Sequence, residues 1–374
     1  MTGTCRRSNP FARLGHWAFT WFLLMAMNAA MTVPTLASPD IWRREGWGRT
    51  DFSKRSIEWS EIVSGGPPKD GIPSIDEPRF VPAVEEKQIA ADEPVIGLEI
   101  NREARAYPIR ILIWHEIVND TVGGVPVAVT YCPLCNAAIV FDRRAAGQTL
   151  TFGTSGKLRR SDLVMYDRET ESWWQQFMGD AIVGTLTGEK LRMIPSRLES
   201  FSLFKERNPS GQVLVPNDPS SRAYGRNPYE GYDTSAIPFF YRGEFRKGID
   251  PMVRVVVVRE GNAAVAVTLE LLRKEQKIEI ADYALSWSDG QASALDHATV
   301  AGGRDVGNVV AQKSTGGRLA DIPYDVTFAF VFHAFHPEGE IIQKCPAEQS
   351  KQGSTQVTAA NIAQRLRCNS VVSD

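Results

Sequence analysis

An internal repeat is the feature of this sequence that most limits its fold. Residues 95–112 align without a gap to residues 255–272, 160 positions further along the chain. Each copy has the pattern of a strand, a turn, a short strand and then a leucine-bearing turn or short helix. A second match follows, between residues 127–131 and residues 283–287. The sequence therefore predicts two related β-rich units that arose by duplication.

The remaining pattern indicates the fold class. Most apolar segments are short, rich in β-branched residues and bounded by Gly, Pro or Asp, which is typical of strands. Short helices are predicted only within residues 108–118 and 200–207, the second of which Asn208-Pro209 would end. We expect a mainly β protein with a few short helices, in which the two units pack as one compact body.

Composition divides the chain into five parts. A leader precedes an irregular arm rich in Trp and Pro, and then come a first β-rich repeat, a second and degenerate β-rich repeat, and a polar tail. Their predicted boundaries are residues 1–37, 38–94, 95–215, 216–345 and 346–374.

The first 37 residues have the features of an export signal. Three arginines precede an apolar run, residues 17–31, that is too short to span a bilayer. Residues 35–37, Thr-Leu-Ala, have the small-x-Ala pattern of a cleavage site. We therefore expect a periplasmic or secreted protein, with an uncleaved N-terminal anchor as the alternative.

The charge balance limits the class of partner. Cleavage of the leader removes three of the 42 Lys and Arg and none of the 44 Asp and Glu, so the mature chain is mildly acidic. Such a chain is not predicted to have nucleic acid or an anionic membrane as its main partner. We expect a small molecule, a metal ion or the thiol of an exported protein instead.

Cys132 and Cys135 lie between two segments that have the pattern of strands, residues 127–131 and 138–141. The cysteines are therefore predicted at the tip of a hairpin. A redox CxxC of the thioredoxin type opens a helix, whose N-terminal dipole stabilises the thiolate, and no helix is indicated here. A Cys-Pro-x-Cys turn between strands is typical of a metal knuckle or of a small disulfide loop.

Three interpretations of this cysteine pair stay open. The thiolates can bind a transition metal such as Zn, Cu or Fe, or the pair can cycle between dithiol and disulfide. In the third interpretation a structural disulfide staples a loop of a non-catalytic ligand-binding module. The second copy of the repeat has Ser288-Asp289-Gly290-Gln291 in place of the cysteines and Glu275 in place of His115. This joint absence predicts that His115 lies near the cysteines and serves as the third metal ligand.

Other residues are candidates for the same site. Glu116 and Asp167 are alternative ligands. Trp173 and Gln176 belong to a dense aromatic segment, in which one side chain is expected in the core and another can line a ligand pocket. His333 and His336 are expected on a strand, where a spacing of three places them on opposite faces.

Lys157 follows Gly153–Gly156, a segment predicted to form a turn that can hold an anion. The simpler interpretation is a β-turn with a solvated basic face. In that case Lys157, Arg159 and Arg160 pair with acids of the next turn, Asp162 among them.

Cys345 and Cys368 lie in the polar C-terminal region. In an oxidising exported compartment an even number of cysteines favours disulfides. These two are predicted to pair with each other as a structural disulfide away from the CxxC.

Several long motifs resemble a bacterial family of exported proteins, domain of unknown function family 3179. They are found at residues 70–73, 104–108, 114–120, 130–136, 152–168 and 172–177. The resemblance covers roughly residues 65–340 and implies export, but it implies no activity.

Common enzyme signatures do not occur in the sequence. It has no phosphate-binding Gly-Lys-Ser/Thr loop, no dinucleotide fingerprint, no HExxH and no CxxCH. No nucleotide cofactor is therefore expected, and a transition metal at the CxxC is the cofactor that the sequence favours.

Overall fold

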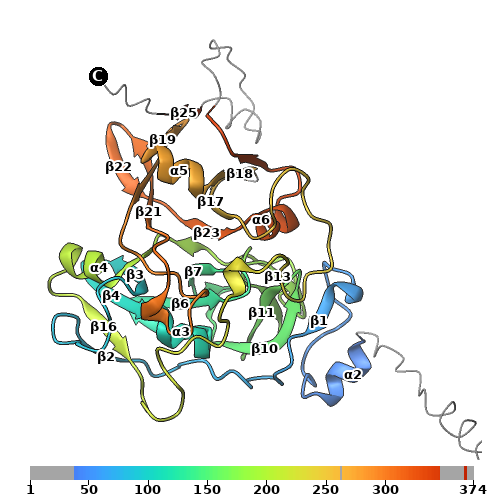
Figure 1. Ribbon diagram of the computed structural model, residues 1–374. Helices are drawn as coiled ribbons and strands as arrows, with labels where there is room; N and C mark the ends of the chain where they lie inside the picture. The colour runs from blue at the N-terminus through green and yellow to red at the C-terminus, as the bar shows by residue number, and fades with distance from the viewer. Residues whose placement is uncertain (1–37, 262, 346–365, 369–374) are drawn as a thin grey trace, which may run out of the picture. The chain divides into compact units, whose positions relative to one another are not determined.

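The computed structural model describes residues 38–261, 263–345 and 366–368 (Figure 1). The predicted export signal, residues 1–37, lies outside the described residues, as does most of the polar tail. No helix in the described ranges is long and apolar enough to cross a membrane. The described chain is mainly β with short helices, as the sequence predicts.

The first copy of the repeat builds two sheets. One sheet consists, in order, of β15 (Arg197–Ser200), β3 (Pro94–Ile100), β4 (Glu103–Pro108), β16 (Gln212–Val215) and β2 (Arg79–Pro82). The other consists of β14 (Met193–Ile194), β7 (Ala137–Asp142), β6 (Val125–Cys132) and β5 (Ile117–Val122). Two helices belong to this copy, α3 (Ile109–His115) after β4 and α4 (Phe201–Arg207) after β15.

The second copy builds the same two sheets. One consists of β23 (Tyr324–Phe328), β17 (Arg254–Glu260), β18 (Ala263–Thr268) and β24 (Glu340–Ile342). The other consists of β22 (Arg318–Asp321), β21 (Asn308–Thr315), β20 (Tyr283–Ser288), β19 (Lys277–Ile280) and β25 (Leu366–Cys368). Its helices are α5 (Leu269–Glu275) after β18 and α6 (Ala329–Phe335) after β23. The strand β4 pairs in parallel with β16 just as β18 does with β24, which confirms the internal repeat.

The two copies agree even in a strained turn. Helix α3 ends at Glu116 with φ 58° and ψ −31°, and helix α5 ends at Gln276 with φ 59° and ψ −32°. A positive φ is uncommon for a residue with a side chain. The duplicated geometry, in which a helix passes directly into a strand, requires this conformation at both positions.

An additional sheet distinguishes the first copy. It consists of β1 (Ile62–Ser64), β10 (Phe152–Arg159), β11 (Asp162–Asp167), β12 (Trp173–Gln175) and β13 (Ala181–Val183). Strands β10 to β13 lie between β7 and β14 in the chain, where the second copy passes directly from β21 to β22. A small hairpin of β8 (Arg144–Ala145) and β9 (Gln148–Thr149) precedes them. The remaining elements are α2 (Pro39–Arg44) and the 3-10 turns η1 (Trp59–Glu61), η2 (Tyr232–Thr234) and η3 (Val300–Gly302).

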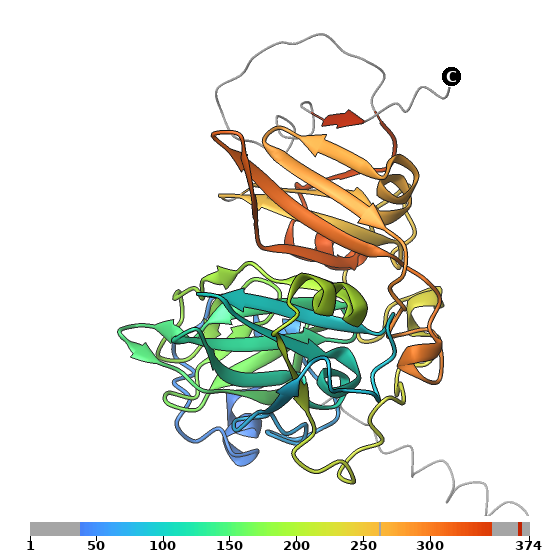
Figure 2. The same cartoon turned by 90° about the vertical axis from the view of Figure 1, so that its left-hand side faces the viewer.

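The end strands of each copy meet the other copy. The Asn136 side chain, just before β7, donates to the carbonyl of Val326 on β23 at 2.7 Å. In the reverse direction, the backbone N–H of Ser200 at the end of β15 donates to Asn308 on β21 at 2.7 Å. Figure 2 shows the strands of the second copy, in orange, beside those of the first. The described body therefore holds both copies together through reciprocal contacts.

Two sequence expectations are wrong. His333 lies on helix α6 and not on a strand, because Pro337 follows the end of the helix and so does not interrupt it. Gly153–Gly156 is not a turn but part of β10, whose register shifts between Thr154 and Lys157. A β-bulge accommodates the glycines there.

The basic residues of β10 pair with the N-terminal arm and not with the next turn. Lys157 is buried and forms an ion pair with Glu45. Arg159 and Arg160 both reach Glu61, at 2.7 and 3.2 Å. The expected local pairing with Asp162 is therefore wrong, because Glu45 and Glu61 of the N-terminal arm are the ion-pair partners instead.

Candidate functional site

The β6–β7 hairpin carries the two cysteines at its tip, as predicted. Cys132 pairs with Ala137 at the end of the ladder, and the turn between them holds Cys135. The turn is closed by the backbone N–H of Cys135, which donates to the carbonyl of Cys132 at 3.2 Å. Both cysteines are free thiols and are buried, with 2% and 0% of their surface exposed.

Hydrogen bonds fix this turn on all sides. The hydroxyl of Tyr232 donates to the carbonyl of Leu134 at 2.9 Å, and that of Thr327 donates to the carbonyl of Cys135 at 2.6 Å. The hydroxyl of Tyr131 donates to the Asn136 side chain at 3.2 Å. Because the turn is held from both copies, its backbone has a fixed position.

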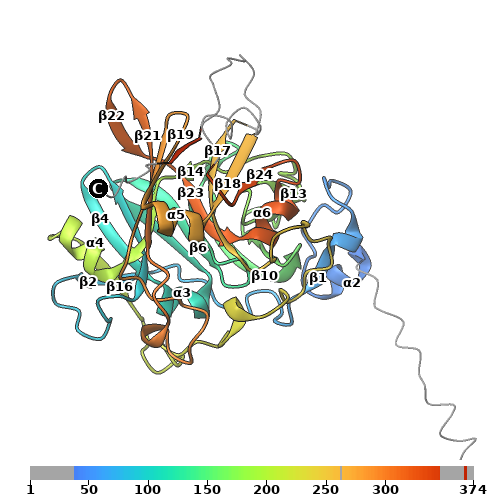
Figure 3. The same ribbon diagram turned by 45° about the horizontal axis from the view of Figure 1, so that its top comes forward.

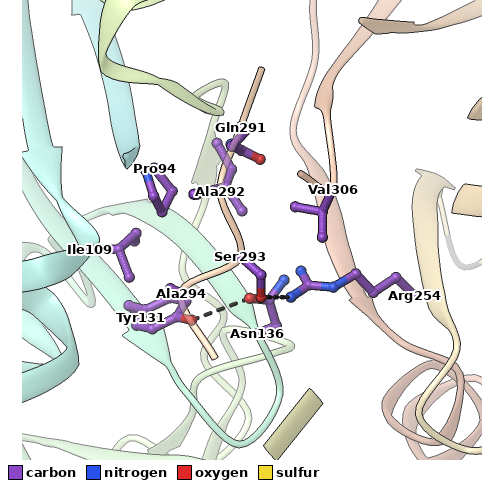
Figure 4. Close-up of a pocket in the computed structure, with 11 residues that line it drawn as sticks. Pro94, Ile109, Tyr131, Asn136, Arg254, Gln291, Ala292, Ser293, Ala294 and Val306 are labelled. Atoms are coloured by element: carbon purple, nitrogen blue, oxygen red, sulfur yellow. Dashed lines mark hydrogen bonds between the residues drawn. The ribbon is translucent and has the colours of Figure 1, made fainter. Parts of the chain in front are cut away.

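A small cavity adjoins the turn (Figure 4). Tyr131 and Asn136 line it from the first copy, and Arg254 and Ser293 line it from the second. Arg254 donates to Ser293 at 2.9 Å and forms an ion pair with the buried Asp233 at 2.8 Å. The ion pair with Asp233 compensates the buried charge of Arg254 within the second copy.

Asp162 joins the cysteines from the additional sheet of the first copy. One carboxylate oxygen of Asp162 and the sulfur atoms of Cys132 and Cys135 all lie within 4.8 Å of one another. The hairpin of β10 and β11 turns at Arg160 and Ser161, which both have positive φ, and Asp162 is the next residue. The carbonyl of Ser161 also accepts from the Cys135 thiol at 3.6 Å.

Only one oxygen of Asp162 is occupied. Its Oδ2 accepts from the side-chain amide of Gln175 at 2.5 Å and from the backbone N–H of Phe177 at 2.9 Å. Its Oδ1 is buried and has no partner among the N–H and O–H donors of the described residues, so that only the weakly donating thiols of Cys132 and Cys135 are left to it. A buried carboxylate oxygen with such weak donors is costly, and this favours a further group at that position.

Burial shifts the protonation of the whole group. It raises the pKa of Asp162 to about 6, and it raises the pKa of Glu116 to about 8 with the help of the Asp162 charge. Burial likewise raises the pKa of the Cys132 and Cys135 thiols. Without a cation at neutral pH, the thiols and Glu116 are therefore protonated, while Asp162 is largely ionised.

His115 has partners of its own. Its Nδ1 is 2.7 Å from the carbonyl oxygen of Pro73, and its Nε2 is 2.7 Å from the hydroxyl of Tyr224. Since a carbonyl can only accept, Nδ1 carries the proton and Nε2 accepts from Tyr224. Burial lowers the pKa of His115, which keeps the ring neutral. His115 is not in the group of ligand atoms around the cysteines, and its contacts tie the arm to α3.

Glu116, the neighbour of His115, is buried and coupled electrostatically to the cysteine site. Its charge raises the pKa of Cys132, the charge of Asp162 raises the pKa of Glu116, and no described side chain forms an ion pair with it. The two residues that follow one another at the end of α3 thus have different roles, one toward the arm and one toward the thiols.

The other candidates do not form one pocket. Asp167 is buried and accepts from Trp174 at 2.8 Å, while the Gln176 amide donates to Thr130 at 2.8 Å below the hairpin. Trp173 is buried against Trp42 and Trp47, with ring centres 4.9 and 5.1 Å apart. The aromatic segment is therefore core, filled by the N-terminal arm.

Cys345 and Cys368 form a disulfide with their Cα atoms 6.1 Å apart. They lie near Glu275 in a group separate from the CxxC. Strand β25, which ends at Cys368, pairs with β19 and forms the edge of that sheet.

The sequence pattern predicted Asp162 as an ion-pair partner of the nearby basic residues and not as part of the site. It gave no indication of Gln175, which donates to Asp162. The two-residue turn before Asp162 lies in the sequence Arg-Arg-Ser-Asp. This sequence has no glycine, so it does not predict a tight hairpin turn. No local pattern connects Asp162 with Cys135 and Cys132, which lie 27 and 30 positions earlier.

The chain belongs to the family described as protein of unknown function DUF3179, whose model matches residues 69–339. Comparison with curated proteins and with solved structures gave no match. The family description names no activity, so the function has to be inferred from the chemistry of the site.

Proposed function

We propose that this DUF3179 protein binds one divalent transition-metal ion, zinc before copper or iron, through Cys132, Cys135 and Asp162. The observation that carries the proposal is the approach of these three ligand atoms to within 4.8 Å of one another in buried surroundings. Ligands of a tetrahedral zinc ion lie about 3.3–3.8 Å apart when the bonds are 2.0–2.3 Å long. Small side-chain rotations are therefore enough to close the site.

The charge balance supports a cation. The nearest arginines on the same hairpin, Arg159 and Arg160, are paired with Glu61, and no described cation forms an ion pair with Asp162. Two thiolates and a carboxylate could not stay ionised in this environment without compensation. A divalent ion supplies it and displaces the thiol protons.

The donor set supports a divalent ion over Cu(I). Copper(I) prefers an all-sulfur set, whereas zinc and iron(II) accept a mixture of thiolate and carboxylate ligands. Glu116 is the candidate for the fourth position, since it is buried, its charge acts on Cys132, and it forms no ion pair among the described residues. Gln175 then orients Asp162 as a hydrogen-bonded partner of a ligand does.

Thiol–disulfide exchange has less support. An attacking cysteine needs a low pKa and access to its partner, but Cys132 and Cys135 are buried and burial raises the pKa of both thiols. A ligand-binding module with a stapled loop has less support as well, because the arm fills the aromatic segment at Trp173.

Metal analysis of the purified protein tests the proposal. We expect about one equivalent of a transition metal after anaerobic purification or reconstitution with zinc, and we expect Cys132→Ser/Cys135→Ser to abolish it. The cobalt-substituted protein should show thiolate-to-cobalt absorption that Asp162→Asn weakens. Less than a tenth of an equivalent in the unmutated protein after reconstitution would refute the proposal.

Two variants serve as matched controls. His115→Gln changes a buried ring that lies next to Glu116 in the chain, and Cys345→Ser/Cys368→Ser removes a second cysteine pair. Both should retain the metal. If His115→Gln lost it while Asp162→Asn kept it, the ligand set would be the one expected from the sequence and not the one proposed here.

Export is part of the proposal, since the leader alone supports it. The protein should be found in the periplasmic or secreted fraction with an N-terminus at Ser38. Retention in the membrane fraction with Met1 intact would favour the uncleaved anchor.

A further inference from the structure

One exposed segment of the chain concentrates large apolar side chains. Six such side chains are exposed in the described residues, and four of them lie between positions 237 and 245. These four are Ile237 (63% exposed), Phe239 (48%), Phe240 (49%) and Phe245 (42%). Residues 237–247 lie between η2 and β17 and contain no helix or strand. They are called the 237–247 segment below. A contiguous exposed group of this kind is uncommon unless something covers it.

Inward contacts hold the segment on both sides of Phe240. The Phe239 ring packs on Tyr232 at 4.7 Å, and its carbonyl accepts from Ser161 at 2.6 Å. The Tyr241 ring packs on Phe330 of α6 at 5.0 Å. Figure 3 labels α6 among the elements of the second copy. The residues on both sides of Phe240 are therefore packed against the body of the protein.

Phe240 has a backbone conformation that aromatic residues rarely adopt. Its φ is 57°, in the left-handed region that favours glycine or asparagine. A phenylalanine at such a position that also points into solvent gains nothing for the fold. Strain of this kind is held where a side chain serves a function, and here the side chain is presented outward.

The charge of the segment indicates what it meets. The segment carries three cations, Arg242, Arg246 and Lys247, and one acid, Glu244. Neither Arg242 nor Lys247 forms an ion pair within the described residues, and Arg246 donates to the carbonyl of Gly339. The segment is therefore locally basic, although the chain as a whole has a negative net charge. Exposed aromatic and aliphatic side chains beside unpaired cations are typical of proteins that bind the interface of an anionic lipid bilayer.

We infer that the 237–247 segment docks the protein on an anionic phospholipid surface. Ile237 and Phe240 insert at the level of the headgroups, while Arg242 and Lys247 pair with lipid phosphates. This inference is independent of the metal site, which lies on the inner side of the same segment.

Co-sedimentation with vesicles tests the inference. The exported protein should bind vesicles that contain phosphatidylglycerol, bind pure phosphatidylcholine vesicles at least tenfold more weakly, and be released by high salt. Ile237→Ser/Phe240→Ser should lower the binding at least tenfold. The control Val84→Ser/Leu319→Ser removes the other two exposed apolar side chains and should leave the binding unchanged. Equal binding by both double variants would overturn the inference.

Phe240→Gly separates docking from folding. Glycine relieves the positive φ, so thermal stability should be kept or raised while vesicle binding falls several-fold and the metal content stays the same. If Phe240→Gly instead dissolved a dimer of the protein and left vesicle binding unchanged, the segment would be an interface between copies of the chain. That result, or an absence of binding to phosphatidylglycerol vesicles, would also overturn the inference.

Discussion

Tyr131 donates its backbone N–H to the carbonyl oxygen of Glu116 at 2.8 Å. This bond joins the strand that ends at Cys132 to the turn that carries the Glu116 carboxyl. The second copy has the same bond between Trp287 and Gln276, at 2.9 Å. The duplicated scaffold thus places a side chain beside the hairpin tip in both copies, but only the first copy has an acid there and cysteines at the tip.

The free energy of unfolding of the metal-free protein should depend on Glu116 and on pH. The folded-state pKa of Glu116 is about 8 and that of Asp162 about 6, both above their ordinary values near 4. The folded chain therefore holds more protons than the unfolded chain between pH 4.5 and 8, and stability falls as the pH rises through this window. For Glu116 alone, the rise in pKa from 4.5 to about 8 corresponds to a loss on the order of 5 kcal/mol.

Denaturant unfolding of the wild type and of Glu116→Gln measures this effect. The difference between the two proteins cancels the other titrating groups, and it should shift in favour of the variant as the pH rises from 4.5 to 8. A difference that stays constant with pH would contradict the burial of an ionisable Glu116. Metal affinity should follow the opposite trend, since the ligands must lose protons to bind.

Gln175→Leu should weaken metal binding without removing a ligand. Gln175 donates to Asp162 at 2.5 Å and fixes the orientation of the free oxygen. Loss of such a partner typically lowers metal affinity about 10- to 100-fold. A competition titration against a chelator measures the change.

Gln312→Leu is the matched control for this change. Gln312 donates to Asp321 at 2.9 Å in the second copy, so the same chemistry is lost away from the cysteines. Its metal affinity should equal that of the wild type. Equal effects of the two variants would mean that general destabilisation, not orientation of Asp162, causes the loss.

The strained helix ends offer a paired test of the repeat. Gln276→Gly should raise the free energy of unfolding by about 0.5–1 kcal/mol, because glycine adopts a positive φ without penalty. Glu116→Gly should stabilise the metal-free protein by more than this at pH 8, since it also removes a buried charge. Thermal or denaturant unfolding checks both. A destabilised Gln276→Gly would contradict the assignment of strain to this turn.

The N-terminal arm should be needed for stability. Trp47 is fully buried and packs on Trp173 and Tyr166, with ring centres 5.1 and 5.0 Å apart. Trp47→Ala should cost about 3–5 kcal/mol, as is usual for large aromatic side chains in a core. Trp59→Ala, at a partly exposed position, should cost clearly less in the same unfolding experiment.

The internal repeat and the hairpin tip were predictable because both depend on local patterns. Alternating apolar residues and β-branched runs report a strand wherever it lies, and two such runs around Cys132 and Cys135 imply a hairpin. The gapless alignment of residues 95–112 with residues 255–272 predicts that both copies pair their strands in the same way. These features need no knowledge of distant contacts.

The composition of the site depends on distant contacts and was decided by the tertiary structure. His115 and Glu116 are neighbours in the sequence, but His115 bonds to Pro73 while the charge of Glu116 acts on Cys132. Asp162 reaches the cysteines only because the additional sheet of the first copy folds its β10–β11 turn onto the hairpin tip. The sequence by itself determined the β-rich repeat and the cysteine hairpin, since strand periodicity is local. Which acid joins the cysteines was decided by the packing of one sheet on another, because no local pattern records that packing.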